Sequence, residues 1–166
     1  KPTLNMSQER PSIFMPRACP NILVFSKLQR IVRPKKEVSL TALPLQFFKR
    51  DTTRVARELL GKTLVRTYRG QRLSGIITEV EAYLGTGDRA CHTFQGRRTS
   101  RTETLFNPGG CAYIYLIYGM HHCLNFVTQE REVPEAVLIR GIFPLDGIPT
   151  MKRLRKRENH SSLKGL

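Results

Sequence analysis

The sequence predicts a single α+β domain built on a curved, mostly antiparallel sheet with short flanking helices. Its 166 residues suffice for one domain with a real core, but not for two full ones. Five short segments have the composition of strands, and hairpin-like links join several of them. The helical segments are few and short. Together these observations favour one domain organised around one sheet.

The N-terminal part of the chain is predicted to be a basic, largely disordered tail covering residues 1–43. It holds 8 basic and 2 acidic residues and five prolines, and it lacks sustained periodicity. Residues 22–25 within it could form one amphipathic turn or two, and the signal for a mitochondrial presequence is weak. The domain is expected over residues 44–166. It carries 20 basic and 11 acidic residues, so the positive charge is not confined to the tail.

The first elements of the domain are one helix and two strands. Asp51 can cap a helix that Gly61 closes. Strands are expected over residues 63–68 and 73–83, with a turn at Gly70 between them. A loop follows at residues 85–88. The apolar positions of the helix are Val55, Ala56, Leu59 and Leu60.

The second half of the domain adds a short helix, three strands and a basic helix. Ser100 and Glu103 have the spacing of a capping box, which predicts a short helix through Phe106. The Asn-Pro-Gly-Gly stretch at residues 107–110 predicts a turn. Strands are expected over residues 112–118, 123–128 and 136–143. A basic helix is expected over residues 149–157.

The charge of the chain favours a polyanionic partner. Lys and Arg number 28 against 13 Asp and Glu, which gives a net charge of +15 and a pI near 10.4. Such an excess promotes fast, salt-sensitive association with nucleic acid. A basic ribosomal, extracellular or RNA-binding protein is the alternative. No apolar run approaches the roughly 18 residues that a membrane span needs, so we expect a soluble protein without a membrane partner.

The cysteines and histidines do not indicate a metal. Cys19, Cys91, Cys111 and Cys123 are irregularly spaced, which disfavours both a disulfide framework and a zinc site. In the run of residues 121–123, His-His-Cys, neighbouring strand residues point to opposite faces and rarely converge on one ion. We therefore expect no metal, no cofactor and reduced thiols, as in the cytosol or nucleus.

Two strands carry polar residues that could perform chemistry. Glu79, Glu81 and Tyr83 share one face of a regular strand. Arg140 lies in a run that otherwise looks buried, and a buried arginine needs a carboxylate partner. Either glutamate could be that partner, as a structural ion pair or as a pair that holds a water. Asn125 is a polar residue in an apolar strand, where its amide could satisfy the backbone or contact a substrate edge.

Aromatic and basic residues near these strands suit nucleic-acid binding. Tyr113 and Tyr115 share a strand face and Tyr118 follows at the strand end, so they form either core or a stacking platform for bases. Arg97, Arg98 and Arg101 suit phosphate contacts beside that platform, or a simple charged loop. No lysine lies between residues 62 and 152, which disfavours attack on a sugar by an amine.

These stretches resemble the alkyladenine (3-methyladenine) DNA glycosylases over about residues 44–157. The order and spacing of many polar residues agree, apart from a small length change between Asn125 and Arg140. The matching stretches are Glu79-Val80-Glu81-Ala82-Tyr83-Leu84-Gly85, then Asp88 to His92, then Arg97-Arg98-Thr99-x-Arg101, then Tyr113-x-Tyr115-x-x-Tyr118-Gly119-Met120 with Asn125, and Val137-Leu138-Ile139-Arg140.

The resemblance implies a monofunctional repair enzyme of the nucleus that flips alkylated or deaminated purines from duplex DNA and hydrolyses the N-glycosidic bond. It implies that Glu81 activates the water and that Arg140 helps to hold it; only the resemblance selects Glu81 over Glu79. Cationic N-alkylated purines would gain a cation–π interaction by stacking on tyrosine. The base pocket would comprise Tyr83, His92, Tyr115 and Asn125, with Asn125 excluding guanine, while Tyr118 and Met120 would intercalate and Arg97, Arg98 and Arg101 would contact phosphates.

The resemblance also raises an alternative function. Family members continue past the basic helix into a Gly-Pro-x-Lys-Leu segment, whereas this chain ends at Leu163-Lys164-Gly165-Leu166. We therefore expect a domain that is incomplete at its C-terminus and acts as a monomer. The alternative to an active glycosylase is a catalytically impaired module that binds damaged DNA.

Overall fold

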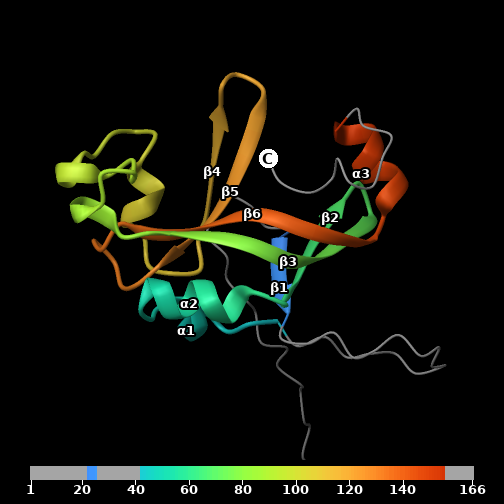
Figure 1. The fold of residues 1–166 in the computed structure, drawn as a ribbon, viewed down its shortest axis with the longest axis horizontal. Helices are drawn as coiled ribbons and strands as arrows, with labels where there is room; N and C mark the ends of the chain where they lie inside the picture. The colour runs from blue at the N-terminus through green and yellow to red at the C-terminus, as the bar shows by residue number, and fades with distance from the viewer. Residues whose placement is uncertain (1–21, 26–41, 156–166) are drawn as a thin grey trace, which may run out of the picture.

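One antiparallel sheet organises the molecule, and the computed structural model describes residues 22–25 and 42–155 of it. The strand order is β1-β2-β3-β6-β5-β4, and every neighbouring pair is antiparallel. The long strands β3 and β6 cross the middle of the molecule (Figure 1). The strands are β1 (Ile22–Phe25), β2 (Thr63–Tyr68), β3 (Gln71–Tyr83), β4 (Ala112–Ile117), β5 (His121–Thr128) and β6 (Glu135–Asp146).

Two short helices cover one face of the sheet. Helix α1 (Leu45–Phe48) precedes α2 (Thr52–Leu59), and Asp51 caps α2 by accepting the Arg54 backbone N–H at 2.8 Å, as predicted. Both helices lie on the same side of β3 and β6 (Figure 1). Burial of apolar surface between this helical layer and the sheet forms the larger core. Its buried members are Ile22, Val24, Phe48, Val55, Ala56, Leu59, Ile77, Phe126 and Val137.

The opposite face of the sheet carries a smaller core and the elements that surround the site. Three 3-10 helices lie at one end: η1 (Gly85–Gly87), η2 (Phe94–Gly96) and η3 (Glu103–Phe106). Helix α3 (Ile148–Arg155) lies at the other end, and the β4–β5 hairpin rises between them (Figure 1). Successive side chains of a strand point to opposite faces of the sheet, so neighbouring residues of one strand contribute to different cores. The smaller core comprises Leu105, Cys111, Tyr113, Val127 and Ala136.

The prediction of a single α+β domain with a curved antiparallel sheet is confirmed, but the predicted number of strands is wrong. Residues 22–25 pair with β2 as a sixth strand instead of forming an amphipathic turn. A bridge between Phe25 and Ala42 extends this edge. Four consecutive apolar residues can be buried equally well in a helical turn and in a strand, and pairing with the edge of β2 decided between them. The remaining residues of the predicted tail lie outside the described residues.

Local details also differ from the sequence prediction. Ser100 does not cap η3. Instead, the backbone N–H of Thr99 donates to Thr102 Oγ1 at 2.8 Å, and the backbone N–H of Thr102 donates to Thr99 Oγ1 at 3.3 Å. These bonds close the turn at residues 99–102 just before η3, and η3 itself has no side-chain cap, so the predicted capping box is wrong. Leu60 follows the end of α2 and is exposed, so it does not belong to the buried face of that helix.

A pair of adjacent leucines tests the packing of α2. Leu59 is fully buried against the sheet, whereas Leu60 is 45% exposed. We predict that Leu59→Ala lowers the free energy of unfolding by about 2–5 kcal/mol, because it leaves a cavity in the larger core. Leu60→Ala should change it by about 0.5 kcal/mol or less. Urea unfolding followed by circular dichroism measures both values, and equal losses would show that α2 does not anchor the core.

Candidate active site

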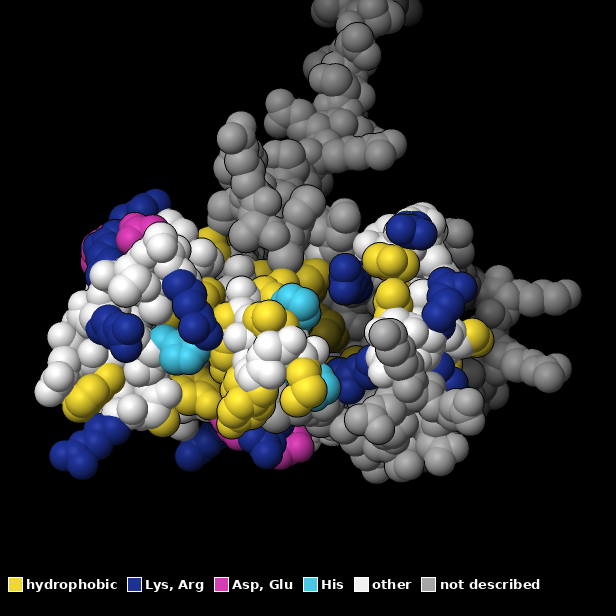
Figure 2. Space-filling view, turned by 90° about the horizontal axis from the view of Figure 1, so that it is seen from above, with side chains coloured by type: hydrophobic (Ala, Val, Ile, Leu, Met, Phe, Trp, Pro, Cys, Tyr) yellow, Lys and Arg dark blue, Asp and Glu magenta, His cyan; other side chains and the backbone are white. Residues whose placement is uncertain are grey.

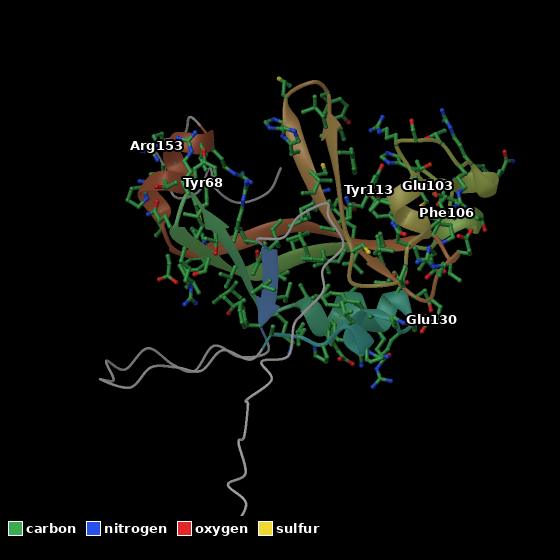
Figure 3. All side chains as sticks on the ribbon, turned by 180° about the vertical axis from the view of Figure 1, so that it is seen from behind. Tyr68, Glu103, Phe106, Tyr113, Glu130 and Arg153 are labelled. Carbon is green, nitrogen blue, oxygen red and sulfur yellow. The ribbon has the colours of Figure 1, made fainter. Side chains whose placement is uncertain are left out.

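A row of residues in register crosses four strands on the face opposite the helices. Glu81 of β3 is paired with Leu138 of β6, Leu138 with Asn125 of β5, and Asn125 with Tyr113 of β4. Residues far apart in the sequence therefore lie side by side. Tyr113 lies on the side of the hairpin that faces Glu103 and Phe106 (Figure 3). The strand order, with β6 between β3 and β5, creates this site.

Two compensating irregularities in the sheet direct Arg140 toward the row. The register between β3 and β6 shifts on each side of Glu79, so that Arg140 has no partner in the ladder. Such bulges redirect a side chain. The guanidinium reaches two carboxylates, Glu79 Oε1 at 2.9 Å and Glu81 Oε1 at 2.5 Å. The expectation of a buried arginine is wrong, because the Arg140 side chain is 41% exposed; the ion pair nevertheless forms, and with both candidate glutamates.

Glu81 differs from Glu79 in its second partner. The Tyr83 hydroxyl donates to Glu81 Oε2 at 2.8 Å. Burial and this hydrogen bond to Glu81 raise the pKa of Tyr83 to about 12, so the phenol keeps its proton and remains a donor. Glu81 thus uses one oxygen for Arg140 and the other for Tyr83. Its side chain is still 37% exposed, so the carboxylate remains open to water.

Tyr83, the partner of this carboxylate, lines a pocket that contains all four residues predicted to hold a base. Its empty volume is about 320 Å³, with the open mouth included. The His92 ring packs edge-on against Tyr115, with ring centroids 4.6 Å apart. The pocket therefore combines aromatic surfaces with polar groups, as small-molecule sites do. Its lining consists of Tyr83, Ala90, Cys91, His92, Leu105, Tyr113, Tyr115, Asn125 and Ala136.

Several members of this pocket were not predicted to belong to it. Tyr113 was expected in the core or in a stacking platform, but it lines the pocket, and its hydroxyl lies 2.9 Å from His92 Nδ1. The alternation of tyrosines in the strand was the signal that pointed to it. Ala90, Cys91 and Ala136 carry no such signal, because small residues become part of a pocket only through the surroundings that the fold provides.

The imidazole of His92 is neutral near pH 7. Burial lowers the pKa of His92, and the nearby charges of Arg101 and Arg97 lower it further. The ring therefore has one nitrogen that donates and one that accepts. Burial likewise raises the pKa of Tyr113, so its hydroxyl stays protonated beside the ring.

Backbone contacts on both sides of His92 hold its loop in place. Asp88 accepts the backbone N–H groups of Leu84 at 3.1 Å and of Ala90 at 2.9 Å. The hydroxyl of the fully buried Thr93 donates to the Pro134 carbonyl at 3.2 Å. The segment before β6 thus anchors the residue that follows His92. A loop held in this way keeps the imidazole aimed at the pocket.

Asn125 has one of the two roles that the sequence left open, that of satisfying the backbone. It is 3% exposed, and its amide nitrogen donates to the Tyr113 carbonyl at 3.2 Å. The contact with a substrate edge stays a prediction. The same residue also lines the pocket. The backbone bond fixes the plane of the amide and hence what it presents to a bound group.

The tip of the β4–β5 hairpin exposes large apolar side chains. Tyr118 is 79% exposed and Met120 is 70% exposed. Tyr118 and Gly119 both have positive φ, at 52° and 68°, and the Met120 N–H bonds to the Ile117 carbonyl at 3.1 Å. Positive φ at both central positions is the requirement of a type I′ turn, and it is unfavourable for a tyrosine. The chain thus holds an aromatic ring in water at an energetic cost.

The three predicted phosphate-binding arginines are not equivalent. Arg98 bonds to Glu103 at 2.7 Å and to Glu132 at 2.6 Å, so its charge is already compensated. Arg97 and Arg101 instead line a second hollow, together with Arg89. On the face that carries the hairpin, basic side chains gather on both sides of it and acidic ones lie at the margins (Figure 2).

The described residues contain neither a metal-binding cluster nor a membrane-spanning helix. Within residues 22–25 and 42–155, no group of three or more His, Cys, Asp or Glu side chains is arranged to hold a metal ion. No helix in this part of the chain is long and apolar enough to cross a membrane.

Comparison with known proteins identifies the family. The methylpurine-DNA glycosylase family matches residues 46–165. A Clostridium perfringens protein is 54% identical over 117 residues, which are 70% of this chain and 57% of that protein. A Bacillus thuringiensis protein is 53% identical over 112 residues, or 68% of this chain and 55% of its own length. Both are named, as provisional assignments, 3-methyladenine DNA glycosylases.

The extent of these matches settles the family but not the whole activity. The chain spans about half the length of the curated relatives that it matches. The family match covers well over half of the chain and includes every residue of the row, the pocket and the hairpin tip. The resemblance inferred from the motifs is confirmed, and the chain belongs to the methylpurine-DNA glycosylase family.

Proposed function

We propose that this protein is a DNA glycosylase that takes an alkylated or deaminated purine out of duplex DNA and hydrolyses its N-glycosidic bond. One observation carries the proposal: Tyr83, which lines the aromatic pocket, donates a hydrogen bond to Glu81, a water-exposed carboxylate that Arg140 orients. An enzyme that acts on a base inside a duplex must extrude that base into such a pocket. The family of the chain and the names of its relatives support the same reaction.

In this proposal Glu81 is the general base. It would take a proton from a water that attacks the sugar carbon, and the electron pair of the broken bond would leave with the base. Arg140 and Tyr83 hold the two carboxylate oxygens in fixed directions. These two partners keep the Glu81 carboxylate aligned before the base arrives, which lowers the cost of organising the reaction.

The pocket would recognise the extruded base by stacking and by hydrogen bonds. Tyr115 and His92 offer adjoining aromatic surfaces, and base–aromatic stacking contributes about 1–3 kcal/mol per base. A neutral His92 would hydrogen-bond to the leaving purine instead of carrying a full charge. This bond matters most for neutral lesions such as hypoxanthine, because cationic alkylpurines already depart readily.

The exposed hairpin tip would fill the gap that the extruded base leaves. Apolar wedges inserted at a base step stabilise opened duplexes in other DNA-binding proteins. Tyr118 and Met120 are the exposed apolar residues of the turn. Arg97 and Arg101 would add phosphate contacts, whereas Arg98 is held by two carboxylates and would contribute less.

A damaged-DNA-binding module without catalysis is the second candidate, because the basic hollow and the exposed hairpin tip would bind DNA whether or not Glu81 activates a water. The test uses duplexes that carry ethenoadenine or hypoxanthine, incubated with the protein and then treated with alkali. Strand cleavage supports the glycosylase. A gel shift without cleavage supports the module, and neither result with any lesion would contradict both.

The two glutamates give the sharpest test of the general base. We predict that Glu81→Gln slows base release by about 10²–10⁴-fold, because an amide keeps the shape but cannot accept the proton. Glu79→Gln is the matched control, since Glu79 also binds Arg140 but lacks the bond to Tyr83. Single-turnover assays measure both rates, with lesion binding checked separately. An inactive Glu79→Gln beside an active Glu81→Gln would assign the role to the other carboxylate.

Asn125 is expected to limit which purines enter. We predict that Asn125→Ser releases guanine from mismatched DNA, which the wild-type protein leaves intact, since a smaller side chain admits the 2-amino group. Loss of the bond to the Tyr113 carbonyl should also lower stability by about 0.5–1.5 kcal/mol. Guanine release is measured by chromatography. A loss of stability with no guanine release would leave Asn125 with its backbone role alone.

Tyr118 is expected to act on the opened duplex and not on the fold. We predict that Tyr118→Ala reduces the fluorescence rise of 2-aminopurine placed beside a lesion, while the free energy of unfolding changes by about 0.5 kcal/mol or less. Tyr118→Phe keeps the ring and should behave as wild type. A variant that unfolds markedly earlier yet opens lesion DNA normally would place this tyrosine outside the mechanism.

A further inference from the structure

Arg101 occupies a position that no other described arginine shares. Its guanidinium carbon lies 5.4 Å from the centre of the Tyr115 ring, an aromatic wall of the pocket. Arg101 also lines the neighbouring basic hollow. The stretch from Ala90 to His92 lines both cavities and separates them. Arg101 therefore stands where the phosphate-binding surface meets the base pocket.

The charge of Arg101 is not compensated locally. Among the residues that the structure describes, no carboxylate lies within ion-pair distance of it, whereas Arg98 three positions earlier has two. The electric field of Arg101 reaches the pocket interior. Burial is the largest cause of the lowered pKa of His92, and the charge of Arg101 is the second largest. It also opposes the rise that burial causes in the pKa of Tyr113.

The acidic groups near the pocket act on Tyr83 and not on the residues beside Arg101. Arg140 is shared between Glu79 and Glu81, so this cluster keeps one net negative charge. Burial and the charges of Glu81 and Asp88 raise the pKa of Tyr83. No carboxylate of the described residues contributes to the shifted pKa of His92 or of Tyr113, on which Arg101 acts. Beside His92 and Tyr113 a base therefore meets a neutral imidazole, a protonated phenol and the Arg101 guanidinium. This end of the pocket favours an uncharged base.

We propose that Arg101 is a specificity-determining residue that makes the pocket favour uncharged purine lesions, such as hypoxanthine and ethenoadenine, over cationic N-alkylpurines. The inference rests on the proposed function and narrows its substrate class. Tyr115 already has a cation beside its π-face, so a cationic base gains less from stacking on it and is repelled by the guanidinium. The cation–π gain expected from the sequence is thus reduced in this pocket.

The test compares a neutral and a cationic lesion in one duplex sequence. Single-turnover release of hypoxanthine and of 7-methylguanine is measured for the wild-type chain and for Arg101→Gln, with spontaneous depurination subtracted. Contacts to phosphate cancel in the ratio of the two rates. We expect Arg101→Gln to shift this ratio toward 7-methylguanine by about 3–10-fold. This is the size of effect expected when one partly screened positive charge near the base is removed.

Two further variants test whether the effect depends on the position of Arg101 and on its positive charge. Arg89→Gln removes the same charge from the same hollow, away from the base pocket lining; it should weaken binding to all duplexes alike and leave the ratio unchanged. Arg101→Lys keeps the charge and should keep most of the preference. An unchanged ratio in Arg101→Gln, or an equal shift in Arg89→Gln, would overturn the inference.

A binding measurement separates this inference from the proposed function. Duplexes carrying 2′-fluorinated 7-methylguanosine or 2′-fluorinated inosine resist cleavage, so their relative affinities do not depend on catalysis. We expect Arg101→Gln to shift this affinity ratio in the same direction as the rate ratio. A wild-type chain that releases neither base contradicts the glycosylase, and the affinity ratio then still decides the role of Arg101.

Discussion

The antiparallel pairing of β3 with β6 is the constraint on which the rest of the molecule depends. The two strands are separated in sequence by residues 84–134, yet they form the centre of the sheet. One face of this pair packs against α2 and the other carries Glu81. The two register shifts around Glu79 release Arg140 from the ladder, so a departure from ideal pairing provides the ion pair. A perfectly regular sheet would contain the same residues but would keep Arg140 within the ladder.

Electrostatic compensation is uneven across the site, and this unevenness has chemical meaning. Arg140 and Arg98 each bond to two carboxylates, whereas Arg101 has no carboxylate partner among the described residues and lies over the Tyr115 ring. Burial lowers the pKa of His92, and the charges of Arg101 and Arg97 reach the pocket and lower it further. The presence or absence of a carboxylate partner thus separates Arg98 from Arg101, although the two lie three positions apart.

The hairpin tip carries an energetic cost that the proposed function explains. A tyrosine with positive φ and an exposed ring stabilises neither the turn nor the core. Below the tip, Tyr113 and Cys123 are buried and hold the hairpin in place. In the proposed function this arrangement presents the ring to a duplex, because the fold, and not the DNA, bears the cost of presenting it.

The sequence by itself determined the class of the fold, most strand positions, the cap at Asp51 and the motifs from Glu79 to Arg140. These are local or patterned properties, set by alternation, turn residues and charge. Only the tertiary structure decided that residues 22–25 complete the sheet, that Tyr113 contacts His92, and that Arg98 is paired while Arg101 is not. Each of these depends on which strands and loops become neighbours. Strand order and register follow from burial over the whole chain, so no window of sequence contains them.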